Sequence, residues 1–248
     1  MTAEPIKPGS YPLDVRQVVK IVVYSLLLVN FTLYIRDDWV IAEHTLHNTS
    51  SLLDLTRAFA TTIDESAWIF LLILFELETY LLSDEPLPRA RTLLMQGIRV
   101  ICYISLSHTL YAYATNLVEI YGAVPLEGIT SLCQMIDQDV SYAYNLVYTK
   151  VSEANCAALS SATQFVYIDP PTHFIIEDRA GLVIEKQLGW VDLIEATTWL
   201  LILFTIEVTV WLQDRNIIEG NVFKFLTIIK IFLYTLLWGA IFYWIYRA

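Results

Sequence analysis

The residues of this sequence best suited to chemistry are ionisable side chains that interrupt strongly apolar stretches. They are three acids and three bases: Glu76, Glu78, Glu207, Lys20, Arg99 and Lys230. A charge inside a bilayer is costly, so such residues usually pair with one another or line the path of an ion or proton. The sequence therefore predicts either interhelical ion pairs or an ion pathway.

Helical geometry assigns partners to these charges. Glu78 and Glu207 lie about six residues before the ends of their apolar segments, roughly 9 Å deep at ~1.5 Å per residue. Arg99 and Lys230 lie at comparable depths in the segments that follow, so we expect the pairs Glu78–Arg99 and Glu207–Lys230. Glu76 points away from Glu78 and is expected to meet Lys20, water or another subunit. The balance of acids and bases favours structural pairs, because a transport site usually leaves a carboxylate free.

Two further polar residues, His108 and Asn30, lie within apolar segments and could extend a polar pathway. A membrane haem needs two histidines at matching depth, and His108 has no such counterpart. His44 and His47 lie near Glu43, but three ligands without a fourth do not predict a metal site. No phosphate-binding loop, dinucleotide fingerprint or nucleophile motif occurs, so we expect neither a cofactor nor catalysis.

The elements that position these residues are long apolar segments. Of 248 residues, 56% are hydrophobic and only 17% are charged, with a mean hydropathy of +0.53. The runs near twenty residues match the length of a helix that crosses a bilayer. They are Val18–Ile35, Ser66–Leu82, Gly97–Val118, Leu193–Leu212 and Val222–Tyr246. The expected fold is an all-α polytopic membrane protein with about five transmembrane helices, with the lipid bilayer as its first partner.

An internal repeat organises these segments. Leu71–Glu78 aligns without gaps on Leu200–Glu207. The polar positions match one another, as the apolar positions do. Three other segments share a cation followed four residues later by tyrosine: Lys20–Tyr24, Arg99–Tyr103 and Lys230–Tyr234. We therefore expect one single helix followed by two repeated hairpins.

Between the hairpins lies a segment long enough to form a small α+β lobe. We divide the chain into residues 1–118 (three helices, with a short outer segment at 37–63), the lobe at 119–190, and two helices at 191–248. Apolar residues at helical spacing predict an amphipathic helix over 129–152. Short β-rich runs follow at Thr163–Ile168, Phe174–Glu177 and Leu182–Glu185. Cys133 and Cys156 both lie in this segment and are either a disulfide or two buried thiols.

Charge sets the expected orientation and narrows the function. Lysine and arginine are densest on the side that holds the N-terminus, so we expect a cytoplasmic N-terminus and an outer C-terminus, in a plasma or inner membrane. The net charge of −11 then falls outside and argues against a nucleic-acid partner. The leading hypothesis is a non-enzymatic structural or accessory subunit that binds other membrane subunits as a homo- or hetero-oligomer. The alternative is an oligomeric cation channel or transporter that uses the intramembrane glutamates.

Overall fold

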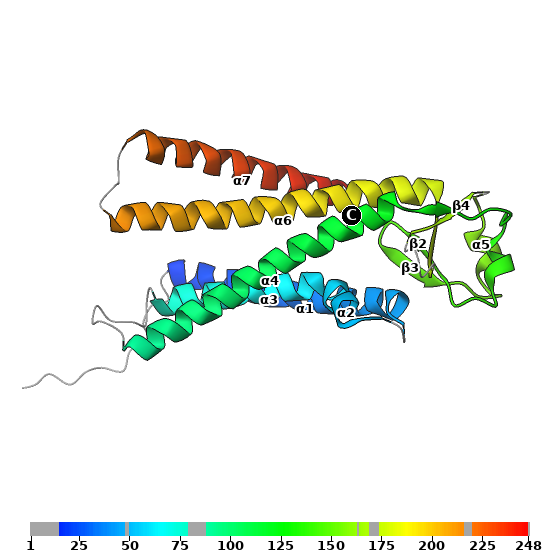
Figure 1. Ribbon diagram of the computed structural model, residues 1–248, viewed down its shortest axis with the longest axis horizontal. Helices are drawn as coiled ribbons and strands as arrows, with labels where there is room; N and C mark the ends of the chain where they lie inside the picture. Colours follow the sequence, from blue (N-terminus) through cyan, green and yellow to red (C-terminus); the bar gives the residue numbers. More distant parts are fainter. Residues whose placement is uncertain are drawn as a thin grey trace, which may run out of the picture.

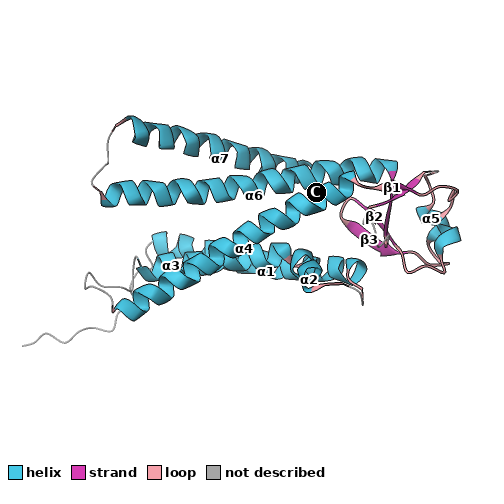
Figure 2. Ribbon diagram, in the orientation of Figure 1, coloured by secondary structure: helices cyan, strands magenta, loops and turns pink. Residues whose placement is uncertain are grey.

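The computed structural model describes residues 15–47, 50–78, 88–162, 164–168, 174–215 and 220–247. Long helices run along the longest axis of the molecule, and a small lobe with a β-sheet lies at one end of them (Figures 1 and 2). We call this end the lobe end and the opposite one the far end. The long helices are α1 (Val15–Thr45), α3 (Ala60–Glu76), α4 (Arg89–Tyr121), α6 (Arg179–Asp214) and α7 (Asn221–Arg247).

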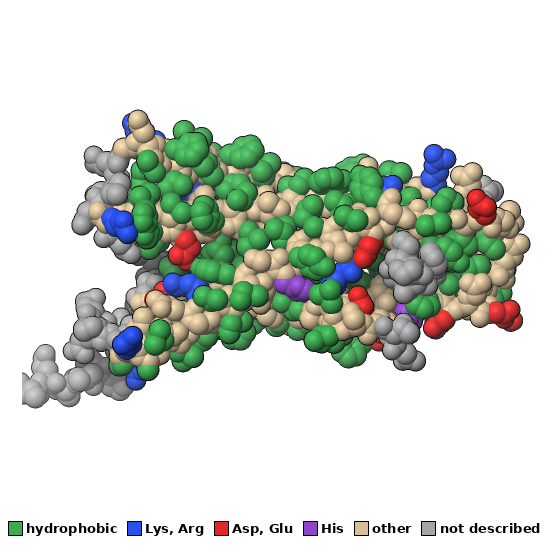
Figure 3. All heavy atoms as spheres, in the orientation of Figure 1, with side chains coloured by type: hydrophobic (Ala, Val, Ile, Leu, Met, Phe, Trp, Pro, Cys, Tyr) green, Lys and Arg blue, Asp and Glu red, His purple; other side chains and the backbone are tan. Residues whose placement is uncertain are grey.

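These helices pack mainly in chain order. The extensive contacts join α1 to α3, α3 to α4, α4 to α6 and α6 to α7. In Figure 1, α4 crosses from the far end of α3 towards the lobe end of α6 and so connects two helical groups. The helices thus form an open layer in which α7 is an edge. Hydrophobic side chains cover much of the helical region on the face shown in Figure 3.

Four helices, α1, α4, α6 and α7, are long and apolar enough to cross a membrane. A fifth span is reached only by joining α2 (Leu52–Ala58) to α3, and these two helices meet at a bend of 69°. The bend lies at Phe59, which ends α2 and precedes α3. The expected count of about five spans therefore depends on this bent pair.

The lobe lies between the end of α4 and the start of α6. Its five strands are β1 (Val124–Pro125), β2 (Ser141–Tyr144), β3 (Val147–Lys150), β4 (Phe165–Tyr167) and β5 (Ile175–Asp178), in the sheet order β1-β4-β5-β2-β3. Only the β2–β5 pairing is parallel. A 3-10 helix, η2 (Leu132–Met135), and a short helix, α5 (Cys156–Leu159), complete it.

Two predictions for the lobe are wrong. Residues 129–152 form no amphipathic helix but η2 and the β2–β3 hairpin, whose two turn residues, Asn145 and Leu146, have φ of 49° and 66°. Positive φ at both central residues is the geometry of a tight hairpin turn that follows strand twist. The run Leu182–Glu185 belongs to α6. Strand β4 lies within the predicted run Thr163–Ile168, and β5 overlaps the run Phe174–Glu177 but ends one residue beyond it.

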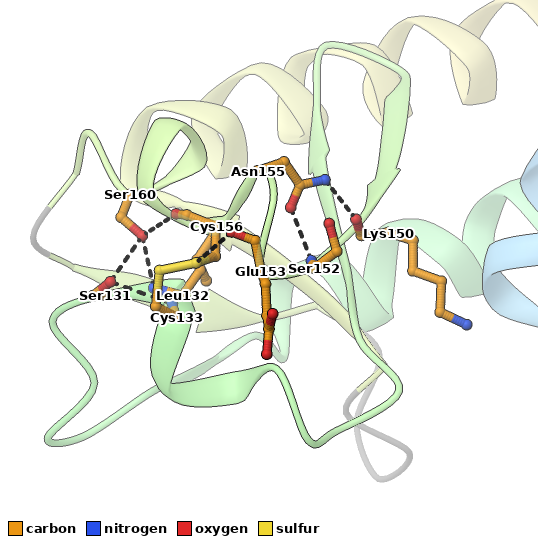
Figure 4. The surroundings of a disulfide bond; sticks show 9 residues. All are labelled: Ser131, Leu132, Cys133, Lys150, Ser152, Glu153, Asn155, Cys156 and Ser160. Carbon is orange, nitrogen blue, oxygen red and sulfur yellow. Dashed lines mark hydrogen bonds between the residues drawn. A yellow bond between two sulfur atoms is a disulfide. The ribbon is translucent and has the colours of Figure 1, made fainter.

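A disulfide and a small apolar core hold the lobe together. Cys133 and Cys156 are bonded, with Cα atoms 4.9 Å apart, so the disulfide alternative is the correct one (Figure 4). Beside it, the Ser160 hydroxyl accepts from the Leu132 backbone at 2.7 Å and donates to the Cys156 carbonyl at 2.6 Å. Phe165 and Ile176 are buried in the core.

The lobe is joined directly to α6. Strand β5 ends at Asp178 and α6 begins at the next residue, so no linker separates them. The Asp178 side chain caps the helix by accepting from the Gly181 backbone at 2.7 Å, and it also accepts from the Tyr142 hydroxyl at 2.9 Å. The sheet and the helix are therefore coupled at this junction.

Candidate functional site

The first of the three cation–tyrosine motifs holds a glutamate between two helices at the far end. Lys20 of α1 donates to both carboxylate oxygens of Glu76 on α3, each at 3.0 Å. Tyr24, one helical turn further along α1, also donates to Glu76. Of the alternatives for Glu76, the structure has the contact with Lys20.

The second motif lies on α4 and contacts two neighbouring helices. Arg99 donates to both oxygens of Glu78, at 2.8 and 2.9 Å, as the helical depths predict. Tyr103 donates to Glu207 of α6. The expected Glu207–Lys230 pair is therefore not the one in the structure, because the α4–α6 contact brings the tyrosine to this carboxylate.

The third motif lies on the edge helix α7 and has no carboxylate partner within the described ranges of the chain. The Lys230 ammonium donates to the Thr209 hydroxyl at 3.3 Å. The side chain of Tyr234 is 46% exposed, and its hydroxyl makes no hydrogen bond within the part of the chain that the structure describes. Two motifs thus engage Glu76, Glu78 and Glu207, whereas the third, on α7, contacts no carboxylate among the described residues.

The suggested polar pathway through His108 and Asn30 has no direct support. Asn30 is exposed on α1 and hydrogen bonds with Tyr34 one turn later. His108 is half-buried on α4 beside Tyr111, and its Nε2 has no partner among the described residues. No hydrogen bond or ring contact joins His108 to Asn30 in the described ranges.

Sequence reasoning missed a group of acids inside the lobe half of the helices, because it assigned them to the solvated outer side. They are Asp38, Asp64, Glu65, Asp192 and Glu195. Asp38 is buried and accepts from the Thr62 backbone at 2.7 Å, while Glu195 accepts from the Trp244 indole at 3.1 Å. A signal existed for part of this group on α6, where Glu185 and Asp192 lie seven residues apart. Thr198 and Thr205 are also seven residues apart, and Thr209 follows one turn later.

A second missed feature is an acidic cavity of about 80 Å³ at the junction of the sheet with α4 and α6. Its polar lining comes from Asn116, Glu119, Tyr148, Glu177 and Glu185. Glu177 is fully buried, and neither of its carboxylate oxygens has a partner in the described structure. Burial, followed by the nearby charges of Glu185 and Asp178, raises the pKa of Glu177 to about 9.

The other candidates for metal binding lie against aromatic rings. His44 contacts the Ser141 hydroxyl at 2.8 Å and stacks on Tyr148, and the His47 ring lies against Phe174. In the described ranges, no three histidine, cysteine, aspartate or glutamate side chains are close enough to hold a metal ion on their own.

Comparisons with protein-family models, curated proteins and solved structures found no match. The function is therefore argued from the two polar sites.

Proposed function

We propose that the protein is a polytopic membrane protein that serves as a non-enzymatic subunit of a membrane assembly. In this proposal the far end and the N-terminus face the cytoplasm, and the lobe lies outside. The partner is another membrane protein that presents a carboxylate to the edge helix α7. The observation that carries the proposal is the third cation–tyrosine motif, Lys230 and Tyr234.

The other two motifs indicate what the third one binds. Lys20 and Tyr24 hold one glutamate together, and Arg99 and Tyr103 hold one glutamate each. Among the residues that the structure describes, Lys230 has only a neutral hydroxyl as its partner, although a cation in this apolar helix favours a counter-charge. A glutamate or aspartate of a second chain at the same depth would complete the pattern.

The surface around this motif is suited to a helical partner. Lys230, Tyr234 and Trp238 recur every four residues and so lie along one face of α7. This face flanks the stripe of Leu233 and Leu237 that packs on α6. Trp238 is 59% exposed, so a partner helix that reaches the motif would also cover aromatic surface.

The test is the size of the complex that the full-length protein forms when extracted in lipid nanodiscs. We expect wild type to migrate as an assembly larger than one chain, and Lys230→Met and Tyr234→Phe to release it as a monomer. Ile228→Ala is the control, because Ile228 is 65% exposed on α7 but lies outside the motif. Lys230→Arg retains the positive charge and should retain the assembly.

Two results would contradict the proposal. One is a wild-type protein that is monomeric in native lipid. The other is an assembly that survives both motif substitutions while the variants remain folded. If the assembly is lost, a partner acid changed to lysine should restore binding to Lys230→Glu, which identifies the contact directly.

Cation transport is the second candidate function, and the buried polar face of α6 favours it. Thr198, Thr205 and Thr209 are all buried and share one face of α6. Each threonine hydroxyl also donates to its own helix backbone, which is a structural role. A flux assay with monovalent cations in liposomes decides between transport and the subunit proposal. The transport function predicts a flux that Glu207→Gln abolishes, and the subunit proposal predicts no flux.

A further inference from the structure

The acidic cavity at the lobe end has more buried carboxyl groups than the described residues supply with cations. Of its three glutamates, Glu119 is paired with Arg57 at 2.6 Å. Glu185 is 8% exposed and accepts one long hydrogen bond, at 3.4 Å, from the Leu146 backbone. Glu177 has no partner among the described residues, and its exposed fraction is zero. Two carboxylates thus face one cavity without a cation.

The position of Glu177 is fixed by the fold. It lies on β5, one residue before the capping residue of α6, with its side chain close to the first turn of that helix. A Cβ added to Gly181 would lie 3.4 Å from one of its carboxylate oxygens. The positive end of a helix favours an anionic group there. The fold therefore presents this carboxylate to the cavity on a rigid strand.

We propose that this cavity binds a divalent cation, Ca²⁺, through the carboxylates of Glu177 and Glu185. Two carboxylates match the charge of one dication. The cavity volume accommodates an ion with part of its hydration shell, since one water takes roughly 30 Å³ of liquid volume.

The chemistry of the lining selects the ion. Its polar atoms are carboxylate, amide and phenol groups from Glu119, Glu177, Glu185, Asn116 and Tyr148, and no histidine or cysteine lines it. Oxygen ligands suit Ca²⁺, which accepts six to eight of them in flexible geometry, often with water among them. Zn²⁺ sites draw instead on nitrogen and sulfur ligands. Asn116 is exposed, so one wall of the cavity meets solvent and gives the ion a route in.

Terbium luminescence tests the site, because Tb³⁺ replaces Ca²⁺ and Tyr148 in the cavity wall can sensitise it. The full-length protein in mild detergent should show saturable luminescence that Ca²⁺ displaces. We expect Glu177→Gln and Glu185→Gln to weaken Ca²⁺ binding at least about tenfold, since loss even of a residue that supports a metal ligand has that effect. Glu153→Gln is the control, because Glu153 is exposed on the lobe and does not line the cavity.

A second measurement separates loss of the site from loss of folding. Ca²⁺ should raise the unfolding temperature of wild type and of Tyr148→Leu, while Tyr148→Leu loses the luminescence. Luminescence that persists in Tyr148→Leu would place the ion elsewhere and overturn the proposal. It would also be overturned if Glu177→Gln folds and still responds to Ca²⁺ as wild type does, or if wild type shows no Ca²⁺-displaceable signal.

Discussion

Under the membrane proposal, the ion pair between Glu78 and Arg99 measures how deep in the bilayer the far-end layer lies. This layer consists of Lys20, Glu76, Glu78, Arg99, Glu207 and Lys230. Glu78→Gln leaves the arginine without its counter-charge, Arg99→Met leaves the glutamate without its own, and the double variant removes both. A double-mutant cycle on these variants isolates the energy of the pair. Methionine is chosen because it preserves most of the arginine stem and its apolar packing.

The expected magnitude follows from the environment. An uncompensated charge in a transmembrane helix costs roughly 2.5–3.5 kcal/mol on insertion scales. Arg99 and Glu78 are 32% and 39% exposed, so part of this cost is relieved by reaching towards the interface. We therefore expect a coupling energy of about 2 kcal/mol. The same pair at a water-exposed surface would couple by roughly 0.2–1 kcal/mol.

The chain supplies its own control for this measurement. Lys150 and Asp139 form an ion pair in the lobe, 2.6 Å long and with side chains 67% and 60% exposed. Both cycles can be run in one assay, the reversible unfolding of the protein by sodium dodecyl sulfate in mixed micelles, followed by helicity. The reasoning is refuted if the Glu78–Arg99 coupling is no larger than that of the lobe pair, because the layer would then be as solvated as the lobe surface.

Four other outcomes are expected, each measured as unfolding of the full-length protein. Tyr103→Phe removes a hydrogen bond to a carboxylate and should cost about 1.5–3 kcal/mol, whereas Tyr234→Phe should cost almost nothing in the isolated chain. Cys133→Ser opens a loop whose ends are 23 residues apart and should destabilise the lobe by about 3 kcal/mol, with wild type in reductant behaving alike. Leu146→Gly should stabilise the protein by about 1 kcal/mol, because leucine is strained at φ of 66° and its side chain is largely exposed. In chelator, stability should fall as pH rises from about 4.5 to about 9, because the raised pKa makes folded Glu177 hold its proton more tightly than the unfolded chain does; Glu177→Gln should flatten that slope.

The far-end layer shows which contacts a sequence can predict. Glu78 and Arg99 lie on consecutive helices at equal distance from the far end, so depth alone brings them together. Glu207 and Lys230 satisfy the same depth rule but do not pair. Each residue step rotates a side chain by about 100° around the helix axis, and depth carries no information about that rotation. The partner of Glu207 is instead Tyr103 of α4, the long helix that packs on α6 from the side opposite in chain order to α7.

The lobe was mispredicted for a related reason. Its apolar residues from Ile129 to Val151 fit a helical period. In the structure, however, Tyr142 is buried in strand β2 and Val140 is buried just before that strand begins. A short apolar run fits either period, and the sheet pairing that decides between them comes from β5, more than twenty residues further on. The usual hairpin signal is also weak, because the turn is Asn-Leu rather than Asn-Gly. By contrast, the placement of the two cysteines in one segment allows the disulfide as one of two alternatives, and the structure has the bond.

The cavity could not have been inferred from sequence, because its two carboxylates are unremarkable until the sheet packs on α6. Glu177 is the third residue of a short strand, and Glu185 lies two turns into a helix. From the sequence alone, each of them is predicted to be a solvent-exposed acid. Burial of Glu177 results from contacts of β5 with β2, β4 and α6, which lie far apart in the chain or meet at a junction. Contacts between segments far apart in the chain thus bring the groups of this cavity together, whereas equal depth on neighbouring helices is enough to bring Glu78 and Arg99 together.

The two polar sites call for different partners, and this difference keeps their tests independent. Counting only the described part of the chain, Glu177 and Glu185 at the lobe end have no cation as partner, whereas Lys230 on α7 has no carboxylate. A dication satisfies the first site and an acidic helix the second, and neither ligand can replace the other. Lys230→Met should therefore leave Tb³⁺ luminescence unchanged, and Glu177→Gln should leave the size of the assembly unchanged. If either substitution altered both readouts, the shared helix α6 would have to transmit the change, since it contributes Glu185 to the cavity and Thr209 to the contact with α7.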